Sequence, residues 1–153
     1  MRQLQKFFIM ILLCLAAGLP ASAQQRGTAD EAKALVEKAV AHIKSVGAKQ
    51  AYADFTATGK WQDRDLYIFA YSFDGTNLAF GDKPGMVGKN LFDLKEANGL
   101  YVIRELAEIA KTKGSGWFNY SWSDPITKKI QPKSSYVVRV PGADAFIGAG
   151  IYK

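Results

Sequence analysis

Aromatic side chains and hydrogen-bond donors alternate along one short segment of the sequence, residues 116–122. In an extended strand, this alternation places Phe118, Tyr120 and Trp122 on one face. Tyr120 and Trp122 each join an apolar body to a single hydrogen-bond donor. Such side chains suit the wall of a pocket for a small polar ligand.

A lysine and a further tyrosine follow at the start of the next predicted strand. If the two strands pair, Lys133 and Tyr136 add an ammonium and a phenol close to the aromatic wall. A cation with several neutral donors is suited to bind one carboxylate. Arg139 is the rival cation, nearer the far end of the strand face that carries Lys133. The alternative interpretation makes the aromatics core residues and Lys133 a solvated lysine.

The sequence gives little support for catalysis or metal binding. A hydrolase needs a nucleophile, a base and an orienting group, yet the single histidine, His42, falls on a predicted helix as a solvated or half-buried residue. The pair Ser134-Ser135 has no histidine nearby in the sequence. The glycines of segment 81–88 lack the lysine and hydroxyl residue that complete a phosphate-binding loop.

Residues 1–23 are typical of a secretory signal peptide that is cleaved. Arg2 and Lys6 precede the uncharged apolar run 7–19, and Ala21-Ser22-Ala23 supplies the cleavage signature. As a helix the run spans ~20 Å, which is too short for the ~30 Å hydrocarbon core of a bilayer. A membrane anchor is the lesser alternative.

Cleavage would leave one domain, residues 24–153, that must be stabilised by its core alone. The single cysteine, Cys14, lies in the leader, so the remaining chain can form no disulfide, thiolate nucleophile or zinc cluster. Loss of the leader's two cations lowers the formal net charge from +6 to +4. Cations cluster no further than Lys128-Lys129, so we expect no nucleic-acid partner, and no stable membrane insertion after cleavage.

Three helices are predicted from periodicity and caps. Thr28-Ala29-Asp30-Glu31 is a capping box, and apolar residues at three- and four-residue spacing follow it as far as Val46. Gly47 is the natural end of this helix. A shorter helix is predicted over 49–56 and a third over 98–113.

From Leu66 onward the hydrophobic period changes to two, which predicts strands. Asp74-Gly75 is a hairpin turn signal, and the glycine-rich segment that follows the second strand is a loop. The order predicts an α+β domain: a five-stranded antiparallel meander behind a long N-terminal helix, with a helix between strands two and three. The five predicted strands are 66–73, 77–80, 116–122, 134–140 and 146–152.

Six segments stand in a recognisable order along the chain. They are Leu66-Tyr67-Ile68-Phe69, Phe73-Asp74-Gly75, Met86-Val87-Gly88-Lys89-Asn90-Leu91, Gly116-Trp117-Phe118-Asn119-Tyr120-Ser121-Trp122, Pro132-Lys133-Ser134-Ser135-Tyr136-Val137 and Ile147-Gly148-Ala149-Gly150-Ile151-Tyr152. In this order and spacing they resemble the Cache domain, specifically the single-Cache type found as the extracytoplasmic sensor module of bacterial chemoreceptors and sensor kinases.

The resemblance implies a PAS-like antiparallel sheet carrying a pocket for small organic acids such as acetate, propionate or pyruvate. It implies a periplasmic sensing module that is not an enzyme, uses no cofactor, and has a membrane receptor or kinase as partner. Carried over by position, the ligand-binding residues are Tyr120, Trp122, Lys133, Tyr136, Tyr71 and Tyr67.

The sequence departs from the family pattern at two points. After Leu78-Ala79 the family commonly has a histidine followed by proline or a small residue, whereas this chain has Phe80-Gly81. A polar contact is lost there, which favours a less polar or differently shaped ligand. Family members within receptors continue into a transmembrane helix, whereas this sequence stops at Lys153. We therefore expect either a free periplasmic component that presents its ligand state to a partner or a stand-alone module.

Three hypotheses remain open at this stage. The first is a periplasmic module that binds a small acid. The second is a structural or interaction domain of the same fold whose pocket is filled by side chains, and the third is an enzyme. The direction of the Lys133 side chain, into a cavity or into water, separates the first two.

Overall fold

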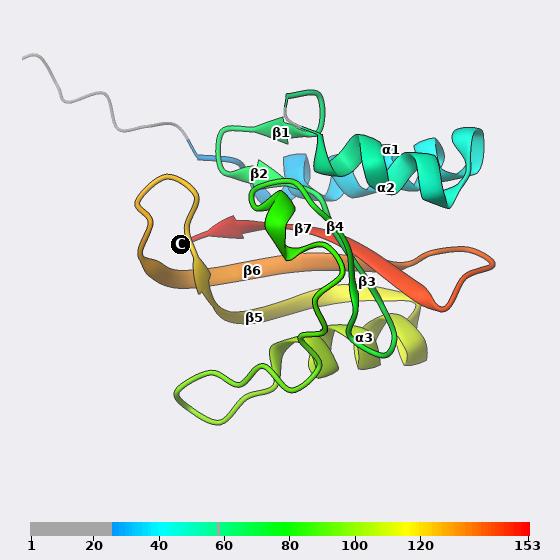
Figure 1. The fold of residues 1–153 in the computed structure, drawn as a ribbon. Coiled ribbons are helices and arrows are strands. Elements are labelled where there is room, and N and C mark those ends of the chain that lie inside the picture. Colours follow the sequence, from blue (N-terminus) through cyan, green and yellow to red (C-terminus); the bar gives the residue numbers. More distant parts are fainter. Residues whose placement is uncertain (1–25, 58) are drawn as a thin grey trace, which may run out of the picture.

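A five-stranded antiparallel sheet separates two layers of helix in the computed structural model, which describes residues 26–57 and 59–153 (Figure 1). The predicted signal peptide lies outside the described residues. The strand order is β4-β3-β7-β6-β5. The strands are β3 (Phe69–Ser72), β4 (Asn77–Phe80), β5 (Ser115–Ser123), β6 (Ile130–Arg139) and β7 (Ala145–Tyr152).

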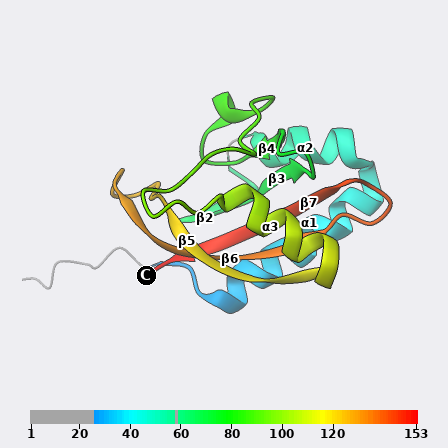
Figure 2. The same ribbon diagram turned by 90° about the horizontal axis from the view of Figure 1, so that it is seen from below.

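Helices cover both faces of this sheet. On one face lie α1 (Ala29–Val46) and α2 (Ala48–Thr56), and on the other lies α3 (Val102–Lys113), which crosses in front of the strands when the molecule is seen from below (Figure 2). The predicted α+β class, with a long N-terminal helix and a five-stranded antiparallel sheet, is therefore confirmed. Within the described part of the chain, every helix is too short or too polar to span a membrane.

The long helix α1 forms where its caps and apolar stripe predict. The Thr28 hydroxyl accepts the Glu31 N–H, and the Glu31 carboxylate accepts the Thr28 N–H, which completes the capping box. Its buried residues are spaced by three or four, which makes one apolar stripe against the sheet: Ala32, Val36, Ala39 and Ile43.

Alternation along the sheet divides the core into two halves. Tyr67, Phe69 and Tyr71 pack toward α3, whereas Ile68 and Ala70 pack toward α1 and α2. The α3 half of the core is rich in tyrosine and phenylalanine side chains. The α1 half consists mostly of aliphatic side chains, together with a few aromatic ones. Buried Lys133 and several buried tyrosines therefore lie on the α3 side.

The sheet is not the predicted meander, because β7 lies between β3 and β6. Nearly every residue of β7 is buried, on both faces of the strand. A strand buried on both faces belongs in the middle of a sheet. The predicted strand 66–73 is also interrupted at Ile68: its first part, β2 (Leu66–Tyr67), pairs with β1 (Gln62–Asp63) in a separate two-stranded sheet.

The third helix begins later than its periodicity predicts. The Asn98 side-chain oxygen accepts the N–H of Leu100, and the N–H of Gly99 donates to the Glu96 carbonyl, which makes a turn. Side-chain hydrogen bonds of this kind compete with helix formation. The helix therefore starts only at Val102. The glycine-rich loop before it contains one short 3-10 turn, η1 (Pro84–Met86).

The β3–β4 hairpin turns at Gly75, as Asp74-Gly75 predicts. Gly75 has a φ of 89°, and a Cβ built there would lie 2.5 Å from the Cβ of Phe92 and 2.7 Å from its backbone N. We expect Gly75→Ala to lower the unfolding free energy by about 1 kcal/mol or more, through backbone strain and this clash. Urea denaturation measures the change. Gly85→Ala is the control, because a Cβ there meets no atom within 4 Å; equal effects would contradict the prediction.

Candidate functional site

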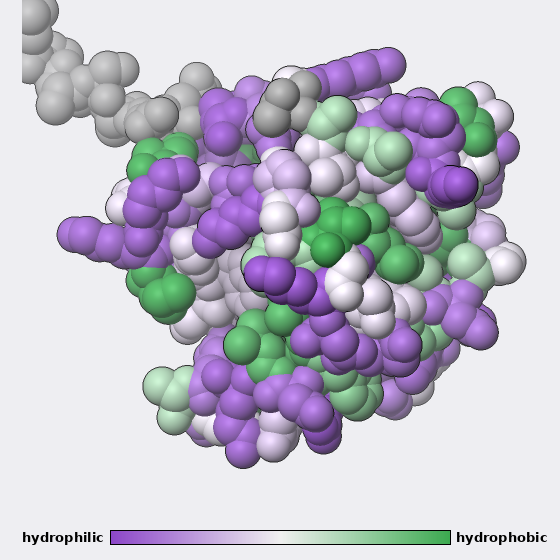
Figure 3. Space-filling model, in the orientation of Figure 1, coloured by the Kyte–Doolittle hydropathy of each residue, from purple (hydrophilic) through white to green (hydrophobic). Residues whose placement is uncertain are grey.

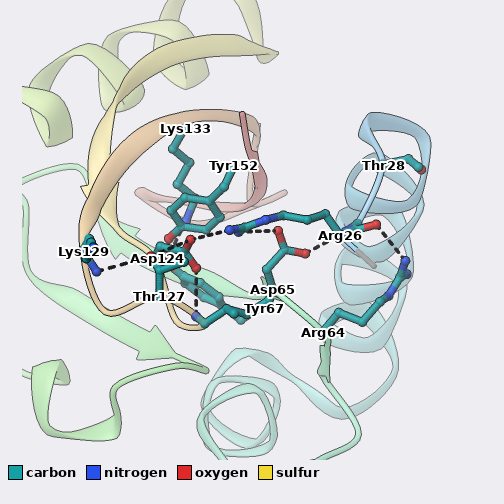
Figure 4. Close-up of polar contacts among 12 residues, drawn as sticks. Arg26, Thr28, Arg64, Asp65, Tyr67, Asp124, Thr127, Lys129, Lys133 and Tyr152 are labelled. Carbon is teal, nitrogen blue, oxygen red and sulfur yellow. Dashed lines mark hydrogen bonds and ion pairs between the residues drawn. The ribbon is translucent and has the colours of Figure 1, made fainter. Parts of the chain in front are cut away.

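The Lys133 side chain points into the protein, although it carries an amine. Lys133 is 1% exposed, and its Nζ donates a hydrogen bond to the Tyr67 hydroxyl over 2.7 Å. Figure 4 shows the lysine reaching from β6 toward the rings of Tyr67 and Tyr152. Among the described residues, no carboxylate lies within ion-pair distance of Nζ. A buried amine without an ion-pair partner is costly, so the fold must hold it in place.

Strand register brings the neighbours of Lys133 together. Lys133 stands directly opposite Tyr120 on β5 and opposite Tyr152 on β7. Residues opposite one another across strands share a face of the sheet. Next to them, a Cβ on Gly150 would lie 2.9 Å from Cε of Lys133 and closer still to the Ser135 Oγ. The glycine on β7 therefore leaves the space that the lysine stem occupies.

Two hydrogen-bonded groups of hydroxyls lie on the sheet face that carries Lys133. The Tyr67 and Tyr152 hydroxyl oxygens are 3.1 Å apart, and the Tyr152 hydroxyl donates to the Ser123 carbonyl over 2.7 Å. The Tyr120 and Ser135 hydroxyl oxygens, on β5 and β6, are 2.8 Å apart. These groups can reorient to donate to an anion beside Lys133.

Aromatic faces replace part of the solvation that Lys133 loses. Nζ lies 4.1 Å from the centre of the Tyr67 ring, 4.8 Å from that of Tyr152 and 5.6 Å from that of Phe69. Cation–π attraction favours the charged amine at such distances. This attraction does not fully offset the loss of solvation, because the pKa of the buried amine is still lowered.

Burial lowers the pKa of Lys133 to about 7, although the negative charges of Asp82, Asp65 and Asp124 act in the opposite direction. Burial raises the pKa of Tyr67 and of Tyr120 well above the usual value, so both hydroxyls stay protonated at neutral pH. The site therefore holds an amine that changes charge near neutrality, surrounded by neutral hydroxyls.

A small internal chamber adjoins the amine. Its volume is about 10 Å³, which is room for about one water molecule. The hydroxyl of Tyr71, which is 1% exposed, has no hydrogen-bond partner among the described residues. The chamber is lined by Tyr67, Phe69, Tyr71, Phe80, Val102, Ile103, Leu106, Tyr120, Trp122 and Lys133.

A larger cleft of about 590 Å³ opens beside the chamber. Three residues line both spaces: Phe80, Val102 and Trp122. The rings of Phe80 and Trp122 stack with their centres 6.4 Å apart and 29° between their planes. These side chains form the partition between the chamber and the cleft.

A buried ionic cluster fixes the loops at the end of the sheet near Lys133. The Arg26 guanidinium donates to Asp124 over 2.6 Å and to Asp65 over 3.3 Å, and both aspartates are fully buried (Figure 4). Burial raises the pKa of Asp124, but hydrogen bonds from Arg26 and from the Ile126 amide outweigh it and lower the pKa to about 2. The cluster ties the start of the described chain to the β5–β6 loop.

The structure brings most of the predicted site residues together. Five of them line the chamber: Tyr120, Trp122, Lys133, Tyr71 and Tyr67. The rival cation, Arg139, is far more exposed, lies 3.8 Å from Asp144 and packs over Phe73 at the far end of β6.

The placement of Tyr136 in the site is wrong. Successive strand residues face opposite sides, so Tyr136 points away from the face that carries Lys133 and packs in the α1 half of the core. Its ring lies 5.4 Å from that of Trp117 and 5.8 Å from the Lys33 amine. The second phenol beside Lys133 belongs instead to Tyr152, which sequence reasoning missed. Nothing in the sequence around Tyr152 indicates that it lies beside Lys133. Its position follows from the pairing of β6 with β7, which sets the two residues opposite one another.

Metal and hydrolase chemistry find no support in the described part of the chain. It contains no group of three histidine, cysteine or acidic side chains that could hold a metal ion. His42 is half-buried, as predicted, and its Nε2 lies 2.6 Å from the Asp54 carboxylate on the α1 and α2 side of the sheet. This pair is separated from the chamber by the sheet.

The fold is a five-stranded antiparallel sheet covered by helices, with one buried lysine beside a small chamber on its α3 face. The family model described as "Cache domain" (dCache_2) matches residues 25–153, and the chain belongs to this family, as its motifs predicted. The matching model is named dCache_2, whereas the resemblance of the motifs is to the single-Cache type. Cache domains are extracytoplasmic sensing modules of chemoreceptors and sensor kinases, and they bind ligands rather than catalyse reactions.

Solved structures of similar shape come from chemoreceptors. A methyl-accepting chemotaxis protein of Vibrio parahaemolyticus superposes with a TM-score of 0.71 at 31% identity, covering 80% of this chain and 86% of that one. A Cache chemosensory domain whose structure is described as the basis for carboxylic acid recognition has a TM-score of 0.67 at 20% identity, covering 80% and 91%. At that identity the second likeness shows the fold alone.

Two curated proteins match part of the chain. The sensor histidine kinase MctS of Rhizobium johnstonii and the methyl-accepting chemotaxis protein CtpM of Pseudomonas aeruginosa are each 36% identical over 89 residues, or 58% of this chain. The matched segment makes up 19% and 16% of those proteins. The chain thus corresponds to a small part of each relative.

Proposed function

We propose that this domain is a periplasmic sensing module that binds a small organic acid, with the carboxylate held by Lys133. The observation that carries the proposal is the direction of the lysine: its amine points into a chamber and not into water. Lysine is almost never fully buried unless it is paired. A bound carboxylate would supply the missing anionic partner.

The neutral groups around the amine fit a carboxylate oxygen. The Tyr67 hydroxyl already accepts from the Lys133 amine, and Tyr120 and Tyr71 line the same chamber. Charge-assisted hydrogen bonds are the strong ones, and they replace the hydration that a carboxylate loses. That a neighbour of the same fold recognises carboxylic acids supports this chemistry.

Localisation and partner form part of the same proposal. Residues 1–23 direct export and are removed, which leaves residues 24–153 as one Cache domain in the periplasm. The ligand state is then read by a membrane receptor or kinase, in keeping with the sensory relatives. Within this proposal, Phe80 makes the ligand chamber less polar than a histidine would.

A thermal-shift screen tests the proposal. We expect acetate, propionate, pyruvate or a near relative to raise the melting temperature by about 10 °C at about a hundredfold excess over Kd. The matched control for each acid is its amide, which has similar shape and no charge. A screen in which no acid stabilises the protein, or in which amides act as well as acids, would support the structural domain with a filled chamber.

A further inference from the structure

The chamber beside Lys133 is smaller than any organic acid. At about 10 Å³ it has room for about one water molecule. A carboxylate oxygen could enter this space and reach the amine, but the rest of the ligand would have to lie elsewhere. A large space that adjoins the chamber is the cleft behind Phe80 and Trp122.

Large hydrophobic side chains line much of the cleft. Of the large hydrophobic side chains that the structure leaves exposed, two line it: Ile130, which is 69% exposed, and Leu94, which is 40% exposed. Hydrophobic surface is visible among hydrophilic residues on the face drawn in Figure 3. The apolar lining comes from several elements: Phe80, Met86, Leu94, Val102, Trp122 and Ile130.

Charges at the cleft select against a cationic ligand. Lys83 and Lys95 line it and are exposed. The one acidic residue there, Glu96, already accepts a hydrogen bond from the Ser121 N–H. These charges disfavour a cationic group on the part of a ligand that lies in the cleft, and the apolar lining favours an uncharged hydrocarbon chain there.

We infer that the ligand is an amphipathic monocarboxylate with an extended apolar tail, which rests on the proposed role of Lys133. Its carboxylate occupies the chamber, and its tail passes between Phe80 and Trp122 into the cleft. The stacked rings must part for the tail to pass, and they then contact it on both sides. The cleft thereby determines which acids bind, and Lys133 determines that an acid binds.

Titration calorimetry of the purified protein with acetate, butyrate, hexanoate and octanoate tests the inference. We expect affinity to rise about threefold per methylene that enters the cleft, with octanoate the tightest. Ile130→Asn should weaken octanoate about fivefold and leave acetate unchanged, because Ile130 lines only the cleft. Val46→Asn is the control: Val46 is 41% exposed at the end of α1, remote from the cleft.

The outcomes separate this inference from the proposed function. If acetate binds as tightly as octanoate, the tail has no site and the inference fails, while the carboxylate role of Lys133 stands. If adipate binds more tightly than hexanoate, the lysines at the cleft bind a second charge and the apolar assignment is overturned. Octanoate binding that survives in Lys133→Met would be adsorption of the tail without a carboxylate site, which contradicts the inference. Binding of no acid at all would refute both proposals.

Discussion

Replacing Lys133 by methionine is expected to abolish carboxylate binding while it stabilises the ligand-free protein. Among the described residues, Lys133 is the only cation that lines the chamber, so its loss removes the charge-assisted hydrogen bonds to the ligand. We expect the affinity to fall by about 2–4 kcal/mol, measured by calorimetric titration with whichever acid binds the wild type. Methionine has a similar length and fills the same volume.

The gain in stability is the part of this prediction that separates function from folding. Burial lowers the pKa of Lys133 to about 7, which means that the charged amine is less stable in the folded protein than in water. Without it, the unfolding free energy should rise by about 2 kcal/mol or more at neutral pH. Tyr67 keeps a hydrogen bond, to the Tyr152 hydroxyl.

Arg139→Met is the matched variant. Its guanidinium is 48% exposed and faces Asp144 at the far end of β6, so ligand affinity and stability should both change little. Unchanged affinity in Lys133→Met would refute the site. Lower stability would instead show that Lys133 is a structural residue.

The helices and the hairpin could be predicted because their signals are local. A capping box, an apolar stripe and a terminal glycine lie within one helix, and the Asp74-Gly75 turn lies within one hairpin. The strand order could not be obtained in the same way. Placing β7 between β3 and β6 depends on pairings between residues far apart in sequence, and its near-continuous burial is the one local sign of a central position.

The same distinction applies to the candidate site. Lys133 and Tyr120 were expected to meet if two neighbouring strands paired, and they stand directly opposite one another. Alternation alone could have excluded Tyr136, because it is an odd number of residues from Lys133 on one strand. Tyr152 depended on the long-range register of β7, and the cleft depended on packing between loops that no sequence pattern specifies.

Carboxylate affinity is expected to fall as the pH rises through neutrality, even though the ligand stays ionised there. In the free protein the pKa of Lys133 is about 7, because burial opposes its charge more strongly than Asp82, Asp65 and Asp124 support it. A bound carboxylate favours the charged amine and therefore raises this pKa. Binding above neutral pH must then take up a proton, and affinity should drop about tenfold per pH unit from about pH 7.5 upward.

Stability should follow the opposite direction in the ligand-free protein. The folded pKa of Lys133 lies below its unfolded value of 10.5, so between these values the unfolded chain binds more protons. The contribution of this group to the unfolding free energy therefore rises as the pH increases from about 7 to about 10. Lys133→Met should lose that dependence, whereas Arg139→Met should retain it.

Calorimetry in buffers of different ionisation enthalpy measures the proton uptake directly. About one proton per ligand is expected near pH 8.5, and close to none near pH 6, where Lys133 is already charged. Affinity that stays constant across this range would mean that Lys133 is fully protonated before the acid arrives. The carboxylate would then be recognised by a permanently charged site, and the chamber would not couple ligand binding to pH.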